Sequence, residues 1–251
     1  MTCSRAQMTQ RLIELLKPGE FHDSCPNGLQ VQGREKIKLL VSGVTASQLL
    51  IDAAVRVSAD AVLVHHGFFW RSEEPCIVGM KAWRLKQLIL ADINLYAYHL
   101  PLDCHPTLGN NAQLGKLMGI AEPTPVNPQQ PNLPLFRGDL PSQMSLKDFG
   151  KSLSVTLDRP PLIVGDRLVR TVFWCTGAGQ SYIERACALG ADVFVTGEVS
   201  EQTIHIAREY GIGFVAAGHH ATERYGVQAV GEALADELGC EHLFIDIDNP
   251  V

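Results

Sequence analysis

The hydrophobic and polar positions along the chain alternate between short apolar runs and amphipathic stretches. In residues 4–16 the apolar side chains recur at helical spacing and a Pro-Gly pair follows, which predicts an N-terminal helix. Residues 39–41 and 61–64 are continuous apolar runs, and residues 47–57 between them repeat at helical spacing. Apolar strands that alternate with helices are typical of a parallel sheet covered on both faces. The pattern therefore predicts an α/β fold.

This strand-helix-strand pattern occurs twice in the chain. When residues 59–61 are aligned with residues 191–193, apolar positions of the preceding helices match as well. Further along, the apolar strands predicted at 93–98 and 213–217 are each followed by a histidine and, four residues later, by a carboxylate. We therefore predict two related α/β lobes that arose by internal duplication.

The prolines suggest where the lobes divide. Residues 121–161 hold eight of the 14 prolines, and proline cannot donate the backbone hydrogen bond that regular elements need. We predict a first lobe with the N-terminal helix at residues 1–120 and a second lobe at residues 162–251. Residues 121–161 are expected to form a Pro-rich linker and the start of the second lobe. Within them, Ser145 and Asp148 have the spacing of a helix N-terminus.

The composition is that of an ordinary globular protein, with 46% hydrophobic and 19% charged residues. The longest apolar runs have four residues, whereas a membrane helix needs about 20, and no apolar signal segment follows the N-terminus. We therefore expect a cytoplasmic protein without membrane contact. The seven cysteines are scattered and never spaced as C-x-x-C, which favours reduced thiols over disulfides or a zinc ribbon.

The charge balance disfavours a nucleic-acid partner. Lys and Arg number 21 against 27 Asp and Glu, a net charge of −6, and no basic block is present. The net charge is an average over the chain, so it does not exclude a local basic surface that binds nucleic acid. The basic residues that suggest such a lining are Arg71, Lys81, Arg84 and Lys86.

Histidines and carboxylates gather just past the predicted strands, where α/β sheets bind their ligands. Imidazole and carboxylate donors without an evident thiolate suit zinc, iron, manganese, nickel or cobalt, and we expect iron, zinc or manganese. A mononuclear catalytic site uses about three protein ligands, so five donors indicate two divalent ions per subunit. The predicted metal ligands are His65, His66, Asp103, His219 and Glu223. Because successive strand residues point to opposite faces, His65 and His66 are expected to converge only if the chain has left the strand.

Two further residues are candidates for moving a proton. His99 and Glu198 also follow predicted strands, and we predict that one of them is the catalytic acid or base. Weaker candidates near the site are Thr45, His105 and His220. Neither a G-x-x-x-x-G-K-[ST] phosphate loop nor a G-x-S-x-G elbow occurs in the sequence.

Several ordered motifs resemble those of a known family, the YbgI branch of the NIF-three-like proteins. They are Pro-Asn-Gly-Leu-Gln-Val at 26–31, Gly-Val-Thr-Ala-Ser-Gln at 43–48, Val-His-His-Gly at 64–67, Tyr-His-Leu-Pro-Leu-Asp at 98–103, Gly-Asn-Asn-Ala at 109–112, Thr-Gly-Glu-Val-Ser-Glu-Gln-Thr at 196–203 and Ala-Gly-His-His-Ala-Thr-Glu-Arg at 217–224. The resemblance implies two similar lobes, assembly into a hexameric toroid as a trimer of dimers, and a dinuclear metal centre. It places the ligands on the five donors chosen above, with His99 nearby. Members are commonly named GTP cyclohydrolase I type 2 homologs.

The expected function is that of a metal-dependent hydrolase. The substrate we expect is a nucleotide-like or other heterocyclic small molecule, attacked at the metal site between the lobes, at the carboxyl ends of the strands. The alternative is a metal-binding toroidal scaffold or adaptor without turnover, which is favoured by the absence of a phosphate loop.

Overall fold

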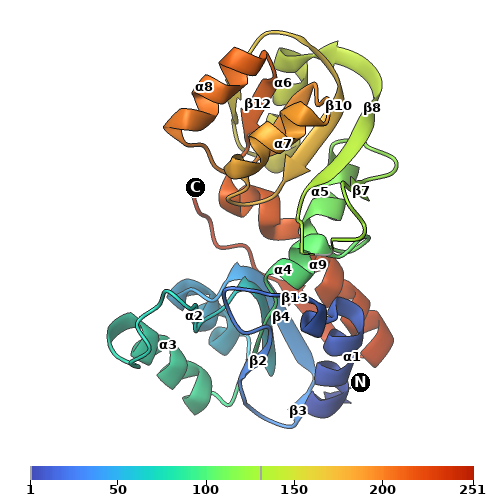
Figure 1. Cartoon of the computed structure of the whole chain (residues 1–251). Coiled ribbons are helices and arrows are strands. Elements are labelled where there is room, and N and C mark those ends of the chain that lie inside the picture. The colour runs from blue at the N-terminus through green and yellow to red at the C-terminus, as the bar shows by residue number, and fades with distance from the viewer. Residues whose placement is uncertain (1, 131) are drawn as a thin grey trace. The chain divides into compact units, whose positions relative to one another are not determined.

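The computed structural model describes residues 2–130 and 132–251 and has a mixed α/β fold, as predicted. It divides into two compact units (Figure 1). The first consists of Met1–Leu102 and Gly226–Asp248, and the second of Asp103–Tyr225 and Asn249–Val251. These limits differ from the predicted ones at residues 120 and 162. The chain returns to the first unit within helix α9 (His219–Leu238), and no local change in composition marks that crossing.

The first unit is built on a five-stranded sheet with the order β13-β4-β5-β6-β2. Strands β13, β4, β5 and β6 run parallel, and β2 pairs antiparallel with β6. The bounds are β2 Gly28–Val31, β4 Leu39–Thr45, β5 Ala61–His66, β6 Asn94–Ala97 and β13 Glu241–Phe244. A separate antiparallel pair joins β1 Cys3–Ser4 to β3 Lys36–Ile37. The central strands are buried and largely apolar. Their burial on both faces explains the continuous apolar runs that predicted them.

Two helices cover one face of this sheet. Helices α2 (Gln48–Arg56) and α3 (Gly79–Leu90) share an apolar cluster with residues of β4, β5 and β6 (Figure 1). Helix α1 (Arg5–Leu16) is followed by a 3-10 turn at Pro18–Glu20, and Thr9 of α1 bonds Tyr96 of β6. The hydroxyls of Ser4 and Ser47 accept backbone N–H groups at the starts of α1 and α2, so both predicted helices begin at serine caps.

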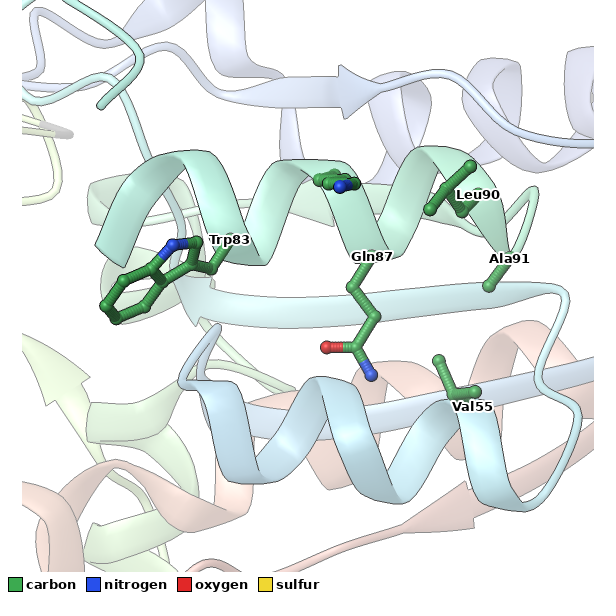
Figure 2. Close-up of a pocket in the computed structure, with 6 residues that line it drawn as sticks. Val55, Trp83, Gln87, Leu90 and Ala91 are labelled. Atoms are coloured by element: carbon green, nitrogen blue, oxygen red, sulfur yellow. The ribbon is translucent and has the colours of Figure 1, made fainter. Parts of the chain in front are cut away.

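The outer side of α3 is apolar and exposed. Between α2 and α3 lies a groove of about 470 Å³, with Val55, Trp83 and Leu90 among its lining residues (Figure 2). Further exposed apolar residues on or just before α3 are Ile77, Val78, Met80 and Ile89. No histidine or carboxylate lines the groove, so its chemistry suits apolar contact and not metal binding.

The second unit is built on a six-stranded sheet with the order β7-β8-β10-β11-β12-β9. Strands β10, β11 and β12 run parallel, and β8 and β9 pair antiparallel beside them. The bounds are β7 Thr124–Pro125, β8 Phe136–Ser145, β9 Leu162–Val164, β10 Leu168–Cys175, β11 Val193–Thr196 and β12 Gly213–Ala216. The parallel core therefore repeats the arrangement of the first unit.

Helices cover both faces of the second sheet. Helices α5 (Asn110–Leu117) and α6 (Leu146–Leu157) share one apolar cluster that includes Trp174. Helices α7 (Ile183–Ala188) and α8 (Glu201–Tyr210) share another that includes Phe173. Because neighbouring strand residues point to opposite faces, the two clusters lie on opposite sides of the sheet. A 3-10 turn at Gln180–Tyr182 precedes α7.

The stretch predicted as a linker is part of this unit. Strand β8 and helix α6 both lie within residues 121–161, and Ser145 caps α6 by accepting the Asp148 N–H at 3.1 Å, as predicted. Pro141 of β8 lies where the β8–β10 register shifts, so its missing N–H removes no ladder bond. Of the prolines in residues 121–161, only Pro141 lies in β8, and the expectation of a linker does not hold for β8 and α6.

Two aspartates support the predicted duplication. Oδ2 of Asp60 accepts the N–H groups of Lys38 and Leu39 at 2.7 and 2.9 Å. In the second unit, Oδ2 of Asp192 accepts the N–H groups of residues 170 and 171 at 3.0 and 2.9 Å. An arginine nitrogen lies 2.9 Å from the other carboxylate oxygen in each case. The aligned aspartates therefore perform the same structural role in both units.

The two units are joined through two helices. Helix α4 (Leu100–Cys104), like α9, contains a point at which the chain passes from one unit to the other. None of the described helices is both long enough and apolar enough to cross a membrane. All seven cysteines are free thiols.

Candidate metal centre

Three histidines come together in the first unit. His65 and His66 are the last two residues of β5, and His99 follows β6 by two residues. One ring nitrogen from each lies within 4.8 Å of the others, and the ring centroids of His65 and His99 are 5.0 Å apart. Three imidazoles at this spacing form a set of donors suited to a borderline divalent cation.

The route by which His65 and His66 approach each other differs from the expectation. The chain has not left the strand, because β5 extends to His66 and pairs with β4 as far as Thr45. On its other side, β5 pairs with β6 only as far as Val64. The last two residues are therefore held from one side alone, and their ring centroids lie 4.4 Å apart.

Hydrogen bonding fixes which nitrogen of His65 can bind a cation. Its Nδ1 lies 3.0 Å from the carbonyl oxygen of Tyr98, in the buried interior. A carbonyl oxygen only accepts, so Nδ1 carries the proton and Nε2 carries the lone pair. A backbone carbonyl that orients an imidazole in this way is the usual support of a metal-binding histidine.

Asp23 holds His99, and the sequence analysis did not identify it. Its Oδ1 lies 2.7 Å from Nδ1 of His99, while Oδ2 accepts from the Asn27 amide and the Leu100 N–H. Burial opposes ionisation of Asp23, but these bonds and the attraction of His99 prevail and hold its pKa well below the usual range. The one sequence signal for Asp23 was the turn motif that follows it at residues 24–28. That motif indicates a loop, but it does not indicate that the loop packs against His99.

Trp70 borders the same histidines. Its ring meets that of His99 edge-on with centroids 5.0 Å apart, and lies 5.9 Å from that of His66. The indole N–H donates to the Gly67 carbonyl at 3.2 Å. Trp70 therefore gives the histidine set one apolar wall.

The second unit gathers two carboxylates and an imidazole. Asp103 and Glu223 are buried, and one oxygen of each lies within 4.8 Å of the other. Nε2 of His219 lies 3.1 Å from Oε2 of Glu223, four residues later on the first turn of α9. This spacing places the two side chains on one helical face.

Asp103 is oriented by uncharged donors. Its Oδ1 accepts from the Asn110 amide at 2.8 Å and from the Thr176 hydroxyl at 3.2 Å. The Asn111 amide donates to the backbone carbonyl of Asp103, and the Asn111 side-chain oxygen accepts the Thr176 N–H at 3.0 Å. These contacts fix the carboxylate without cancelling its charge, which suits a metal ligand.

His219 is held at both nitrogens. Nδ1 lies 2.7 Å from Oε1 of Glu198, and Nε2 faces Glu223. Burial lowers the pKa of His219, but the bonds and charges of Glu223 and Glu198 outweigh it and raise that pKa to about 9. The proton on Nε2 of His219 therefore lies between this nitrogen and Oε2 of Glu223. A divalent cation that replaced this proton would have both atoms as ligands.

Gly177 makes room for this group. Its φ is +63°, and a Cβ there would lie 2.1 Å from Oε1 of Glu223 and 3.1 Å from Nε2 of His219. Only glycine allows the backbone to pass so close. The space beside Glu223 and His219 is thus kept open by the chain, and the residues present fit a divalent cation in both donor chemistry and room.

The weaker candidates have ordinary contacts. Nδ1 of His105 accepts the N–H groups of residues 107 and 108, and the His220 N–H donates to the Val251 carbonyl. Thr45 lies 3.2 Å from Nδ1 of His66 and so supports that ligand. Among the residues of the suggested basic lining, Lys81 is buried and paired with Glu73, which argues against such a lining.

Comparison with known proteins identifies the family. The family model Duf34/NIF3 (NGG1p interacting factor 3) matches residues 3–250. The chain belongs to this family. A Pseudomonas aeruginosa relative named GTP cyclohydrolase 1 type 2 homolog is 51% identical over 251 residues, covering 100% of both chains. A Haemophilus influenzae relative with the same name is 53% identical over 247 residues, covering 97% of this chain and 98% of its own.

Solved structures of this Duf34/NIF3 fold agree with the architecture. A protein named ybgI, described as of unknown function, has a TM-score of 0.93 and 48% identity and covers 99% of this chain and 100% of its own. A Thermus thermophilus protein has a TM-score of 0.90 and 32% identity, with the same coverage. The predicted resemblance is therefore confirmed at the level of family and fold.

Proposed function

We propose that this Duf34/NIF3 protein binds two divalent cations per chain and uses them in hydrolysis. The observation that carries the proposal is that the first unit brings three imidazoles within 4.8 Å of one another and the second brings Glu223 beside both Asp103 and His219, with an imidazole held at Nδ1 by a carboxylate in each unit. The proposed ligands are His65 and His66 in the first unit and Asp103, His219 and Glu223 in the second. The family resemblance favours a single dinuclear centre of iron, zinc or manganese to which both sets contribute.

The chain's own residues have distinct tasks in this proposal. Bound divalent cations supply Lewis acidity, which makes a water nucleophilic near neutral pH and polarises the bond under attack. His99 moves the proton at its Nε2, because its Nδ1 is held by Asp23. Glu198, the other candidate for proton transfer, already accepts the Nδ1 proton of His219, so we assign it the task of positioning His219.

The substrate class we propose is nucleotide-like or otherwise heterocyclic. The support is the name GTP cyclohydrolase 1 type 2 homolog, carried by relatives that are 51% and 53% identical to this chain. In a reaction of that kind, water attacks a ring carbon and a ring C–N bond breaks, with the proton passing to the departing nitrogen.

Activity measurements with defined metal content test this proposal. We expect protein loaded with manganese, iron or zinc to release product from GTP or from another compound in a panel of nucleotides and cyclic amides. Glu223→Gln is expected to lose metal and turnover, whereas Glu201→Gln, an exposed glutamate on α8, keeps both. Unchanged turnover in Glu223→Gln contradicts the proposal. Stable metal binding without turnover of any compound supports the alternative of a metal-binding scaffold.

We further propose that the chain assembles with copies of itself as a hexamer, a trimer of dimers. The resemblance implies this assembly, and the exposed apolar side of α3 is a surface suited to bury in it.

A further inference from the structure

A cavity in the second unit adjoins the carboxylate-imidazole set. It has a volume of about 510 Å³ and is lined by Glu198, the residue that holds His219, and by Arg159, Gly197 and Ala216. Glu198 and Ala216 lie at or just past the carboxyl ends of β11 and β12, where α/β sheets place their ligands. A space of this size suits a small organic molecule, since such sites measure about 300–1,000 Å³.

Arg159 enters the cavity without a partner of opposite charge. Within residues 2–130 and 132–251, its side chain forms no hydrogen bond or ion pair, and its Nε is buried from water. Arg34 and Arg167, by contrast, are paired with Asp60 and Asp192. A partly buried guanidinium without an anion is costly, and an oxyanion that enters the cavity would relieve that cost.

The backbone around Arg159 fixes the guanidinium in place. Arg159 follows the left-handed cap of α6 at Asp158, its N–H donates to the Ser154 carbonyl at 3.0 Å, and two prolines follow. The side chain packs on Gly218, where a Cβ would lie 2.7 Å from Nε and 3.0 Å from Cζ. Gly218 directly precedes His219, so the guanidinium and the imidazole are anchored on adjacent residues.

Glu198 does not neutralise this arginine. Its Oε1 faces Nδ1 of His219 at 2.7 Å, and its Oε2 accepts from the Gln180 amide at 3.4 Å. Leu162 and Val199 add apolar wall to the cavity. Pro250 and Val251 also line the cavity. The site therefore offers one fixed guanidinium beside apolar surface and the Glu198 carboxylate, whose oxygens are already engaged, a combination suited to an organic molecule with a single anionic end.

We propose that Arg159 binds the oxyanion group, phosphate or carboxylate, of the substrate and orients it beside His219. This inference rests on the proposed function and adds a substrate class to it: an organic molecule with an anionic end and an apolar or ring-shaped body. Arg159 is a binding residue in this proposal and takes no part in proton transfer.

Binding to the metal-free full-length protein tests the cavity separately from turnover. We would measure calorimetric binding of GMP, guanosine and succinate at millimolar concentration. We expect GMP or succinate to bind and guanosine to bind at least about tenfold more weakly, because a charge-assisted bond contributes about 1.5–3 kcal/mol. Preference for GMP identifies phosphate as the group recognised, and preference for succinate identifies carboxylate.

Variants locate the effect on Arg159. Arg159→Gln is expected to weaken anion binding by about 10- to 100-fold, Arg159→Lys to weaken it less, and Gly218→Ala to weaken it by displacing the guanidinium. Arg208→Gln, which removes an exposed arginine of α8, is the matched control and keeps wild-type binding. Circular dichroism establishes that each variant is folded.

Three results overturn the inference: no probe binds the wild type, guanosine binds as tightly as the anions, or folded Arg159→Gln binds as tightly as the wild type. None of these depends on metal content or turnover. Failure of the proposed hydrolysis with intact, Arg159-dependent anion binding therefore remains distinguishable from failure of this inference.

Discussion

At the scale of single residues, the candidate centre depends on hydrogen bonds that set the state of each imidazole. Nδ1 of His65 faces a carbonyl, that of His99 faces Asp23, and that of His219 faces Glu198. In each case the acceptor assigns the proton to Nδ1, which leaves Nε2 as the nitrogen for a cation or, in His99, for proton transfer. The acceptors that orient the imidazoles are thus as informative about the chemistry as the imidazoles themselves.

Asp23→Asn tests the support of His99. The amide cannot stabilise charge on the imidazole, so we expect turnover of the metal-loaded protein to fall about 10- to 100-fold while metal content stays near wild type. Steady-state kinetics together with metal analysis measure both effects. Asp92→Asn is the control, because Asp92 is exposed and its φ of +57° suits asparagine. Equal rates in Asp23→Asn and wild type would contradict the assigned role.

Gly177→Ala tests the space beside Glu223. The added Cβ would collide with Glu223 and His219, so we expect loss of metal binding in the second unit. Gly211→Ala has a matching φ of +65° with nothing within 4 Å of the new Cβ. Both substitutions introduce a backbone strain of about 1–2 kcal/mol. Only the Cβ added at Gly177 also collides with other side chains. Equal metal affinity of the two variants, by calorimetric titration, would count against the site.

Metal removal makes His219 sensitive to pH. In the metal-free protein burial lowers its pKa, but Glu223 and Glu198 raise it from the ordinary 6.5 to about 9. A raised pKa stabilises the folded state fully below pH 6.5, and that stabilisation is lost as pH rises through about 9. We therefore expect the Tm of metal-free protein to fall across this window, and the added stability from manganese to grow, because the cation replaces a proton.

Calorimetric scans from pH 6 to 10, with and without manganese, measure this effect. Glu223→Gln removes the carboxylate that faces Nε2 of His219 and should flatten the dependence. A stabilisation by manganese that stays constant over the whole range would show that no proton leaves the site when the cation binds.

At the scale of elements, the two units use one design: a parallel core whose carboxyl ends carry the candidate ligands. β5 ends at His66, and Glu198 and His219 follow β11 and β12 by two and three residues. In each unit an aspartate ties the start of one strand to the loop before the next. These equivalent hydrogen bonds explain why both halves of the sequence have an aspartate at this position, Asp60 and Asp192.

Asp60→Ala and Asp192→Ala are expected to have similar costs. Each leaves two backbone N–H groups and an arginine without their acceptor, which lowers the free energy of unfolding by about 2 kcal/mol. The larger effect should belong to Asp60, whose side chain is 12% exposed against 26% for Asp192. Chemical denaturation measures both, with exposed Asp236→Ala as control. A cost confined to one unit would contradict the equivalence.

At the scale of the whole molecule, the exposed apolar side of α3 bears on assembly. Trp83 is 69% exposed at the groove of Figure 2, and Leu90 is 75% exposed. If copies of the chain bury this surface, Trp83→Glu places a charge in the contact and should shift the assembly to smaller species. Tyr210→Glu changes an aromatic residue that is 63% exposed on α8 and should leave the assembly unchanged. Sedimentation velocity measures both, and an unchanged mass for Trp83→Glu would exclude this surface.

The sequence by itself determined the fold class, most helices and strands of the parallel cores, and the residue types gathered at the strand ends. These follow from local periodicity and from the rule that ligands collect at carboxyl ends of parallel strands. The expectation of a Pro-rich linker at residues 121–161 does not hold for residues 136–157, because β8 joins the sheet by pairing with distant β10 and α6 follows it. Local composition does not encode such a pairing.

Only the tertiary structure decided which partners hold the candidate ligands. Asp23 lies 76 residues before His99 in the sequence, and Thr176 lies 73 residues after Asp103. The close approach of Gly177 to Glu223 and the unpaired guanidinium of Arg159 beside Gly218 likewise arise from contacts between distant segments. A sequence pattern reports the periodicity of one segment, whereas orientation, burial and protonation depend on what another segment brings against it.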